Sequence, residues 1–255
     1  MLVSNPFDED VWAPTIPGTA PPVVLFLPAR DEAATVAAVL ARTPATVTAA
    51  GRTHPVHTLV VDDGSSDGTG DVARAAGATV VRTPGIGLGG AVRVGLAWAA
   101  ACGAAAVAFC DADLEYDPAE LPRLVEPVLE GRADYVVGSR FLGGRRRMRP
   151  HRLLGNRVLT ALTAAATVGC RAVPLTDGQS GYRALSGAAA ADADIAHDYN
   201  YAQILTLDLL RRGHRYLEVP IDYAHREVGR SFVHLPTYLR QVLPAMWRVR
   251  RGPVA

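Results

Sequence analysis

The chain has 255 residues, of which 49% are hydrophobic, and a formal net charge of +1 at pH 7. This size and composition suit one large α/β domain with a sizeable core. The small net charge argues against a nucleic-acid partner, and no run of about 18 apolar residues predicts a bilayer-spanning helix. The three cysteines Cys102, Cys110 and Cys170 form no CxxC pair, so neither a disulfide framework nor a zinc site is indicated, and a reducing cytoplasm is the simplest compartment.

Short β-rich runs alternate with helical segments in the first part of the chain, after residues 1–21, which we expect to form a flexible N-terminal tail. The expected strands are 23–27, 57–61, 79–82, 104–110 and 134–138, and the expected helices include 32–42, 91–101 and 119–130. This alternation predicts parallel strands, right-handed crossovers and a ligand at the carboxyl ends of the strands.

A polar loop follows each of these strands. The loops read PARDE, DDGSSDGT, PGIGLGG, DADLEYDP and GSR in chain order. Because the carboxyl ends of parallel strands meet at one edge of a sheet, we expect all five loops to face one crevice.

The pattern loosens beyond Arg140. An Arg-rich loop that includes Arg145–Arg147 leads into a helix expected at 153–168, and TDGQSGYRAL forms another polar loop. A helix is expected at 200–212, and an edge strand at 216–221 because it contains a proline. Residues 236–255 are expected to form a basic amphipathic C-terminal helix and tail.

The loop sequences disfavour several nucleotide-binding classes. No GxGxxG follows the first strand and PGIGLGG lacks the ending of a P-loop, so dehydrogenase and P-loop NTPase functions are disfavoured. DADLEYD presents carboxylates at i, i+2 and i+4, which are hard ligands suited to Mg²⁺ or Mn²⁺. It lacks the Gly and Glu of a calcium-binding EF-hand loop. The alternative is an ordinary acidic turn, and Asp117 before Pro118 is interpreted as the N-cap of the next helix.

Taken in order, PARDEAATV, VVDDGSSDGT, PGIGLGGAVRVGL, DADLEYDP, YVVGSR, TDGQSGYRA and EVPIDYAHREVGRS resemble the family 2 glycosyltransferases of the GT-A fold. The nearest branch is that of the dolichyl-phosphate and polyprenyl-phosphate hexosyltransferases. The resemblance covers roughly residues 22–235. It implies a single GT-A domain of the nucleotide-diphospho-sugar transferase type, with a mostly parallel central sheet and helices on both faces. It also implies a nucleotide-sugar donor, a divalent Mg²⁺ or Mn²⁺ ion and inversion at the anomeric carbon.

The resemblance assigns donor and metal roles to eight residues of the strand-end loops. The nucleotide pocket would be shaped by Pro28, Arg30 and Glu32, and either Asp62 or Asp63 would meet the base or ribose. The DxD pair, which would bridge the metal and the diphosphate, is Asp111 and Asp113. Glu115 stands where relatives often have Gln, and it would complete the metal shell.

The acceptor decides which further residues are catalytic. A departing nucleoside diphosphate accumulates negative charge, which a metal held by Asp113 and an Arg partner such as Arg140 would stabilise without proton transfer. A phosphate monoester acceptor is already anionic and needs no strong base. Its candidate ligands are Arg140, Arg226, Arg230 and Ser231. A hydroxyl acceptor needs a base, and Asp177 is the carboxylate that the resemblance places best.

Two departures from the resemblance concern the acceptor. Phe232 follows Ser231 where relatives commonly have Lys, and many relatives continue into transmembrane helices. The C-terminal segment around Trp247 suits docking at a membrane surface, or packing on the domain or on a second subunit.

We therefore predict a hexosyltransferase that moves mannose or glucose from GDP or UDP to a polyprenyl phosphate, in the cytoplasm or at the inner face of the membrane. Three alternatives are transfer to a soluble hydroxyl acceptor, a catalytically silent nucleotide-sugar binding module and, less favoured, a sugar nucleotidyltransferase. The sequence leaves peripheral membrane contact and a homodimer open.

Overall fold

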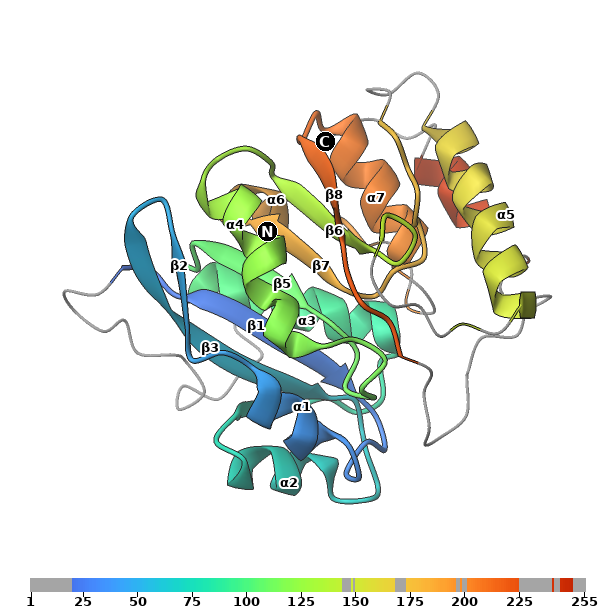
Figure 1. The fold of residues 1–255 in the computed structure, drawn as a ribbon. Helices are drawn as coiled ribbons and strands as arrows, with labels where there is room; N and C mark the ends of the chain where they lie inside the picture. Colours follow the sequence, from blue (N-terminus) through green and yellow to red (C-terminus); the bar gives the residue numbers. More distant parts are fainter. Residues whose placement is uncertain are drawn as a thin grey trace, which may run out of the picture.

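The computed structural model describes residues 20–143, 148, 150–167, 173–195, 198, 201–224, 240 and 244–249. Figure 1 shows the arrangement of its helices and strands. The strands are β1 Val23–Ala29, β2 Thr46–Ala49, β3 Arg52–Asp62, β4 Thr79–Arg82, β5 Ala106–Phe109, β6 Tyr135–Ser139, β7 Arg183–Ser186 and β8 Tyr216–Pro220. The helices are α1 Val36–Arg42, α2 Thr69–Ala75, α3 Leu88–Ala101, η2 Pro118–Glu120, α4 Leu121–Leu129, α5 Pro150–Ala166, α6 Gly187–Asp192 and α7 Ala202–Arg211.

The strands form one sheet in the order β2-β3-β1-β5-β7-β6-β8, and β4 pairs with the C-terminal part of β3. β1 lies parallel to β3 and β5, and β6 lies parallel to β8. β7 is antiparallel to both of its neighbours, β5 and β6. The start of β7 therefore lies at the same edge of the sheet as the ends of β5 and β6, so the loop before β7 joins the loops after the parallel strands.

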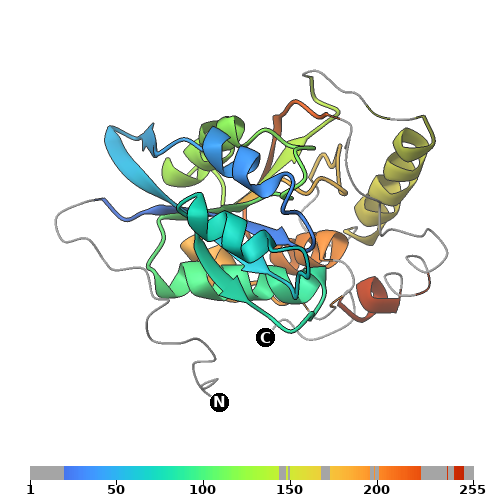
Figure 2. The same ribbon diagram turned by 90° about the horizontal axis from the view of Figure 1, so that it is seen from below.

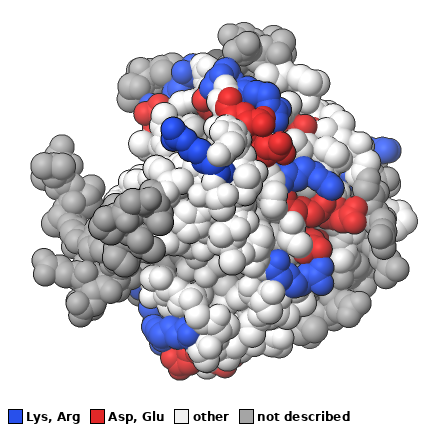
Figure 3. Space-filling view, turned by 60° about the vertical axis from the view of Figure 1, so that its left-hand side comes forward, with Lys and Arg blue, Asp and Glu red and all other residues white. Residues whose placement is uncertain are grey.

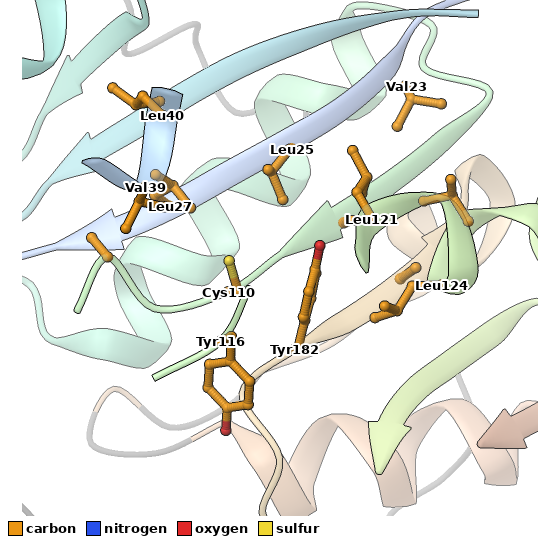
Figure 4. Packing of buried hydrophobic residues seen from close by; sticks show 14 of the residues in the cluster. Val23, Leu25, Leu27, Val39, Leu40, Cys110, Tyr116, Leu121, Leu124 and Tyr182 are labelled. Atoms are coloured by element: carbon orange, nitrogen blue, oxygen red, sulfur yellow. The ribbon is translucent and has the colours of Figure 1, made fainter. Parts of the chain in front are cut away.

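Helices cover both faces of the sheet (Figures 1 and 2). On one face, α1 and α4 pack on alternate residues of β1, such as Leu25 and Leu27, as Figure 4 shows. On the other face, α3, α6 and α7 pack on the intervening residues, such as Val24 and Phe26. β1 is buried along its whole length, as expected for a central strand with two covered faces.

A glycine brings α3 close to the sheet. A Cβ atom added at Gly95 would lie only 2.4 Å from the ring of Phe26, which itself stacks on Phe109 with 4.9 Å between the ring centroids. Any larger residue at position 95 would push the helix away from β1 and β5, whose ends carry the candidate site loops.

The predicted α/β fold with a mostly parallel sheet and helices on both faces is confirmed. The predicted edge strand is β8, and the predicted N-cap is also confirmed because the Asp117 side chain accepts a hydrogen bond from the backbone N–H of Ala119. Two short strands, β2 and β7, were not predicted. The expected helix 32–42 begins only at Val36, because residues 32–35 form a turn in which Thr35 N–H donates to the carbonyl of Glu32.

The structure describes only part of the predicted C-terminal helix, and residues 244–249 of it are helical. In the described part of the chain, no helix has both the length and the apolar character needed to cross a bilayer. The face in Figure 3 carries acidic and basic side chains in mixed groups, separated by uncharged surface, in agreement with the net charge of +1.

Candidate active site

Hydrogen bonds tie together the loops that follow β1 and β3. Asp31 accepts from the backbone N–H of Ser66 at 2.8 Å, and its own N–H donates to Ser65 Oγ. Glu32 N–H donates to Thr69 Oγ1. These two loops therefore form one connected surface at the carboxyl edge of the sheet, as the strand alternation predicts, and Asp63 joins the loop after β4 to it.

Asp63 positions the glycine-rich loop after β4. Its buried carboxylate accepts from the Thr83 hydroxyl at 2.6 Å and from the backbone N–H groups of Ile86 at 2.6 Å and Gly87 at 2.8 Å. Gly87 has a φ of +82°, and a Cβ there would lie 2.8 Å from the Asp198 carbonyl oxygen. Both features require glycine at this position.

The other four residues predicted for the nucleotide pocket lie in the same region. Asp62 is buried, accepts from Ser65 N–H at 2.9 Å and lies 3.8 Å from Arg82 Nε. Glu32 accepts from the Thr35 hydroxyl. Pro28 lies within β1 and is buried, whereas Arg30 is exposed at its end and lies near Gly85. The structure brings these residues together, and their contacts with a nucleotide remain predictions.

The loop after β5 holds the DxD pair. Asp113 is buried and accepts from the backbone N–H of Glu115 at 3.1 Å. Leu114, which lies between Asp113 and Glu115, has a φ of +63°, which is rare for a residue other than glycine, and its side chain is exposed. A strained, exposed leucine between two predicted metal ligands indicates a loop shaped for function rather than for stability.

A carboxylate of this loop lies close to the backbone before β7. A Cβ added at Gly181 would lie 2.7 Å from Asp111 Oδ2. The Gly181 N–H donates to the hydroxyl of Tyr116 at 2.7 Å, and burial raises the pKa of that hydroxyl, so Tyr116 stays neutral. A larger residue at position 181 would therefore have to displace the Asp111 carboxylate.

The donor chemistry of Asp111 and Asp113 fits a divalent ion. Within the described residues, no group of three or more His, Cys, Asp or Glu side chains is arranged to hold a metal ion. Mg²⁺ is, however, commonly held by one or two carboxylates together with substrate phosphate oxygens and water. Two aspartates at the carboxyl edge of the sheet match that mode of binding.

Glu115 contacts a cation from α5. Its carboxylate accepts from Arg152 Nη1 at 2.9 Å, and the same nitrogen lies 3.2 Å from the Tyr223 hydroxyl. Burial raises the pKa of Tyr223, so the hydroxyl stays neutral beside the two charges. The predicted metal role of Glu115 remains a prediction, and the structure adds an ion pair that links the metal loop to α5.

Arg140 and Asp177 form a buried two-pronged ion pair. Arg140 Nε donates to Asp177 Oδ2 at 2.7 Å and Nη2 donates to Oδ1 at 2.8 Å, while the Arg140 backbone N–H donates to Oδ2 at 3.0 Å. The Arg140 and Asp177 side chains are only 5% and 0% exposed. Burial alone would lower the pKa of Arg140, but its neighbours, Tyr116 and Asp177 first, raise it above the ordinary value. Arg140 is therefore charged, and the Asp177 carboxylate that accepts its two hydrogen bonds neutralises it.

The segment that carries Asp177 is itself anchored from β8. The Glu218 carboxylate accepts from the backbone N–H groups of Thr176, at 2.9 Å, and Asp177, at 3.2 Å, and from the Thr176 hydroxyl. Farther along, Arg183 is fully buried and donates to the carbonyls of Ser180 and Gly178. These contacts hold the reversed strand and its loop against the end of β6.

Some predicted residues lie outside the described part of the chain. Among them are three predicted acceptor ligands, Arg226, Arg230 and Ser231, as well as Arg145–Arg147. Sequence reasoning also missed four residues that shape the site: Arg152, Glu218, Arg183 and Tyr223. Glu218 and Tyr223 stand inside the quoted motif EVPIDYAHREVGRS and Arg183 inside TDGQSGYRA, whereas no local signal singles out Arg152.

A family model for glycosyl transferase family 2 matches residues 25–183. The chain is similar to an undecaprenyl-phosphate mannosyltransferase of Micrococcus luteus, with 38% identity over 68% of this chain and 74% of the relative. It is also similar to a polyprenol monophosphomannose synthase of Mycolicibacterium smegmatis, with 34% identity over 71% and 73%.

Among solved structures, the chain resembles glucosyl-3-phosphoglycerate synthase from Mycobacterium tuberculosis in complex with phosphoglyceric acid. The TM-score is 0.70 at 25% identity, over 91% of this chain and 81% of that one. The same enzyme in complex with Mn²⁺, UDP-glucose and phosphoglyceric acid gives a TM-score of 0.67 at 25% identity, over the same shares of the two chains.

Proposed function

The chain belongs to glycosyl transferase family 2, and from this premise we propose that it moves a hexose, mannose or glucose, from a GDP- or UDP-sugar to a polyprenyl phosphate with inversion at the anomeric carbon. The two relatives with lipid-phosphate names support the acceptor. The crystallised complexes of the structural neighbour with UDP-glucose and Mn²⁺ support the donor class and the use of a divalent ion.

The observation that carries the choice of acceptor is the buried Arg140–Asp177 pair. A hydroxyl acceptor must lose its proton, and the base must lie within hydrogen-bond reach of it. Both carboxylate oxygens of Asp177 already accept from Arg140, and the side chain has no exposed surface. A phosphate monoester needs no such base, because its oxygens are anionic at neutral pH. The site is therefore better suited to a phosphate nucleophile than to an alcohol.

The predicted site residues would then divide the work between donor and acceptor. The loops joined by Asp31 and Asp63 would hold the nucleotide, and Asp111 and Asp113 would hold a Mg²⁺ or Mn²⁺ ion beside the diphosphate. When bound, that ion supplies positive charge where the leaving diphosphate accumulates negative charge. Arg140 Nη1 is the guanidinium nitrogen not bound to Asp177, and we assign it to the acceptor phosphate together with Arg226, Arg230 and Ser231.

The acceptor assignment is tested with a matched pair of acceptors that differ only in the phosphate: a short polyprenyl phosphate and the corresponding polyprenol. Labelled GDP-mannose, GDP-glucose, UDP-mannose and UDP-glucose are supplied in turn with Mn²⁺ or Mg²⁺. We expect label in the phosphate acceptor with at least one donor and none in the alcohol. Transfer to the alcohol at a comparable rate would rule out the phosphate assignment.

A second candidate is transfer to a soluble acceptor that itself carries a phosphate group. The structural neighbour favours this candidate, because it was crystallised with phosphoglyceric acid, a soluble molecule that carries a phosphate group. A catalytically silent nucleotide-sugar binding module is the third. Phosphoglyceric acid added to the same donor panel separates these functions: soluble labelled product supports the second, and donor binding without any labelled product supports the third.

A further inference from the structure

Helix α5 has its apolar side toward solvent. After its first residue, Pro150, which is also exposed, the described exposed positions recur with helical spacing and are Leu154, Arg157, Val158, Ala161, Leu162 and Ala165. The three large side chains among them, Leu154, Val158 and Leu162, are 66%, 50% and 39% exposed. A surface helix of a soluble protein normally shows the opposite arrangement, with polar residues outside. We call these six positions the α5 stripe.

The other side of α5 makes polar contacts with the protein, so the helix cannot rotate to bury the stripe without breaking them. Arg152 pairs with Glu115 of the metal loop. Thr160 Oγ1 accepts from the backbone N–H of Gly178, next to Asp177, at 3.0 Å. Thr163 is fully buried. These contacts fix the outward orientation of the stripe, and they put α5 in contact with both halves of the candidate site.

The C-terminal segment extends the exposed surface. Residues 244–249 are helical, and Met246 packs with Leu159 and Leu207 in a small separate cluster. Trp247 of this segment is half exposed. Figures 1 and 2 both show α5 and the red C-terminal segment beside each other at one side of the molecule, away from the main sheet.

The charge of this surface selects its partner. The described residues of α5 and of the segment 244–249 include neither Asp nor Glu. Because Arg152 is paired with Glu115, the described arginines that charge this surface are Arg157 and Arg248, both exposed. Two copies of such a surface would bring like charges together. An anionic lipid surface would attract the arginines and take up the apolar side chains at its interface, as it does for amphipathic helices that lie in the membrane plane.

We propose that the α5 stripe, with Trp247 and Arg248, docks on an anionic bilayer surface with α5 lying in the interface. Docking there would bring the metal loop and the loop that carries Asp177, both contacted by α5, next to the lipid headgroups. The benefit of this placement for catalysis rests on the proposed function, because only an acceptor phosphate carried by a lipid has to reach the site from a bilayer.

The experiment is flotation of the full chain with two kinds of vesicle, phosphatidylcholine alone and an equal mixture with phosphatidylglycerol, without donor or acceptor. The test variant replaces Leu154, Val158 and Leu162 together by Gln, which preserves helix propensity. We expect wild type to float with the anionic vesicles, and the triple variant to partition at least about tenfold more weakly. Single substitutions give a matched control: Leu162→Gln should weaken flotation and Leu88→Gln should not, although the two leucines are 39% and 37% exposed.

Three results would overturn the proposal. One is wild type that floats with neither kind of vesicle, and another is a triple variant that floats like wild type. The third is a dimer of wild type in sedimentation equilibrium that the triple variant dissociates, which would assign the stripe to a second copy. Flotation needs no turnover, so a protein that docks through α5 but makes no glycolipid would refute the proposed function alone.

Discussion

The Arg140–Asp177 pair leads to a quantitative prediction for Asp177→Asn. The substitution keeps the shape of the side chain but removes the negative charge opposite a guanidinium that is only 5% exposed. Removing one partner of a buried ion pair costs about 3–5 kcal/mol, because the other charge stays buried without compensation. For a domain of this size, 1 kcal/mol lowers the melting temperature by about 2–4 °C, so we expect a decrease of roughly 6–20 °C.

The control is Asp71→Asn. Asp71 also pairs with an arginine, Arg74, but both side chains are more than half exposed, so we expect a change of less than about 1 kcal/mol. Thermal unfolding followed by circular dichroism measures both variants. The double variant Arg140→Met/Asp177→Leu adds a second test, since it leaves no unpaired charge and should be destabilised by less than the sum of its two single changes. A melting temperature of Asp177→Asn within 1 °C of wild type would refute the reasoning.

The other predictions concern packing, metal binding and acid stability. Gly95→Ala should lower the free energy of unfolding by about 1–3 kcal/mol, because its Cβ would overlap an aromatic ring of the sheet, whereas Gly155→Ala, with nothing within 4 Å, should be neutral or stabilising in the same denaturant titration. Asp113→Asn should abolish the Mn²⁺-dependent part of the thermal shift caused by the donor, and an unchanged Mn²⁺ dependence would contradict the metal assignment. A hydrogen bond from Arg215 holds the pKa of Asp134 at about 2. Because this lies below the unfolded value of about 3.9, the stabilisation is present above pH 4 and is lost as the pH falls toward 2. Asp134→Asn should remove that part of the pH dependence of the melting temperature. A variant whose melting temperature falls between pH 4 and pH 2 as steeply as that of wild type would contradict this prediction.

Features with a local signal were predictable from the sequence. Apolar runs that end in polar loops predicted the parallel strands and the grouping of loops at their carboxyl ends, where Asp63 and Asp113 lie. The Asp117 N-cap was also local, since an aspartate before a proline at a helix start is a known capping pattern.

Features that depend on partners far apart in the chain were not predictable. The four residues of β7 carry no sign of their reversed direction, which is set by pairing with β5 and β6. Arg140 and Asp177 are 37 residues apart, and each was assigned its own role because nothing in the sequence shows that they neutralise each other. The outward side of α5 could not be read from its periodicity, because helical spacing says that one side is apolar but not which side faces solvent.

The central claim is that a phosphate oxygen of a lipid acceptor attacks the anomeric carbon of the donor sugar. Its most direct test is the structure of the product formed from a donor labelled with ¹³C at that carbon, determined by nuclear magnetic resonance. We predict a ¹³C signal split by coupling to phosphorus, with an anomeric configuration opposite to that of the donor. A labelled carbon without phosphorus coupling, or a product with retained configuration, would contradict it.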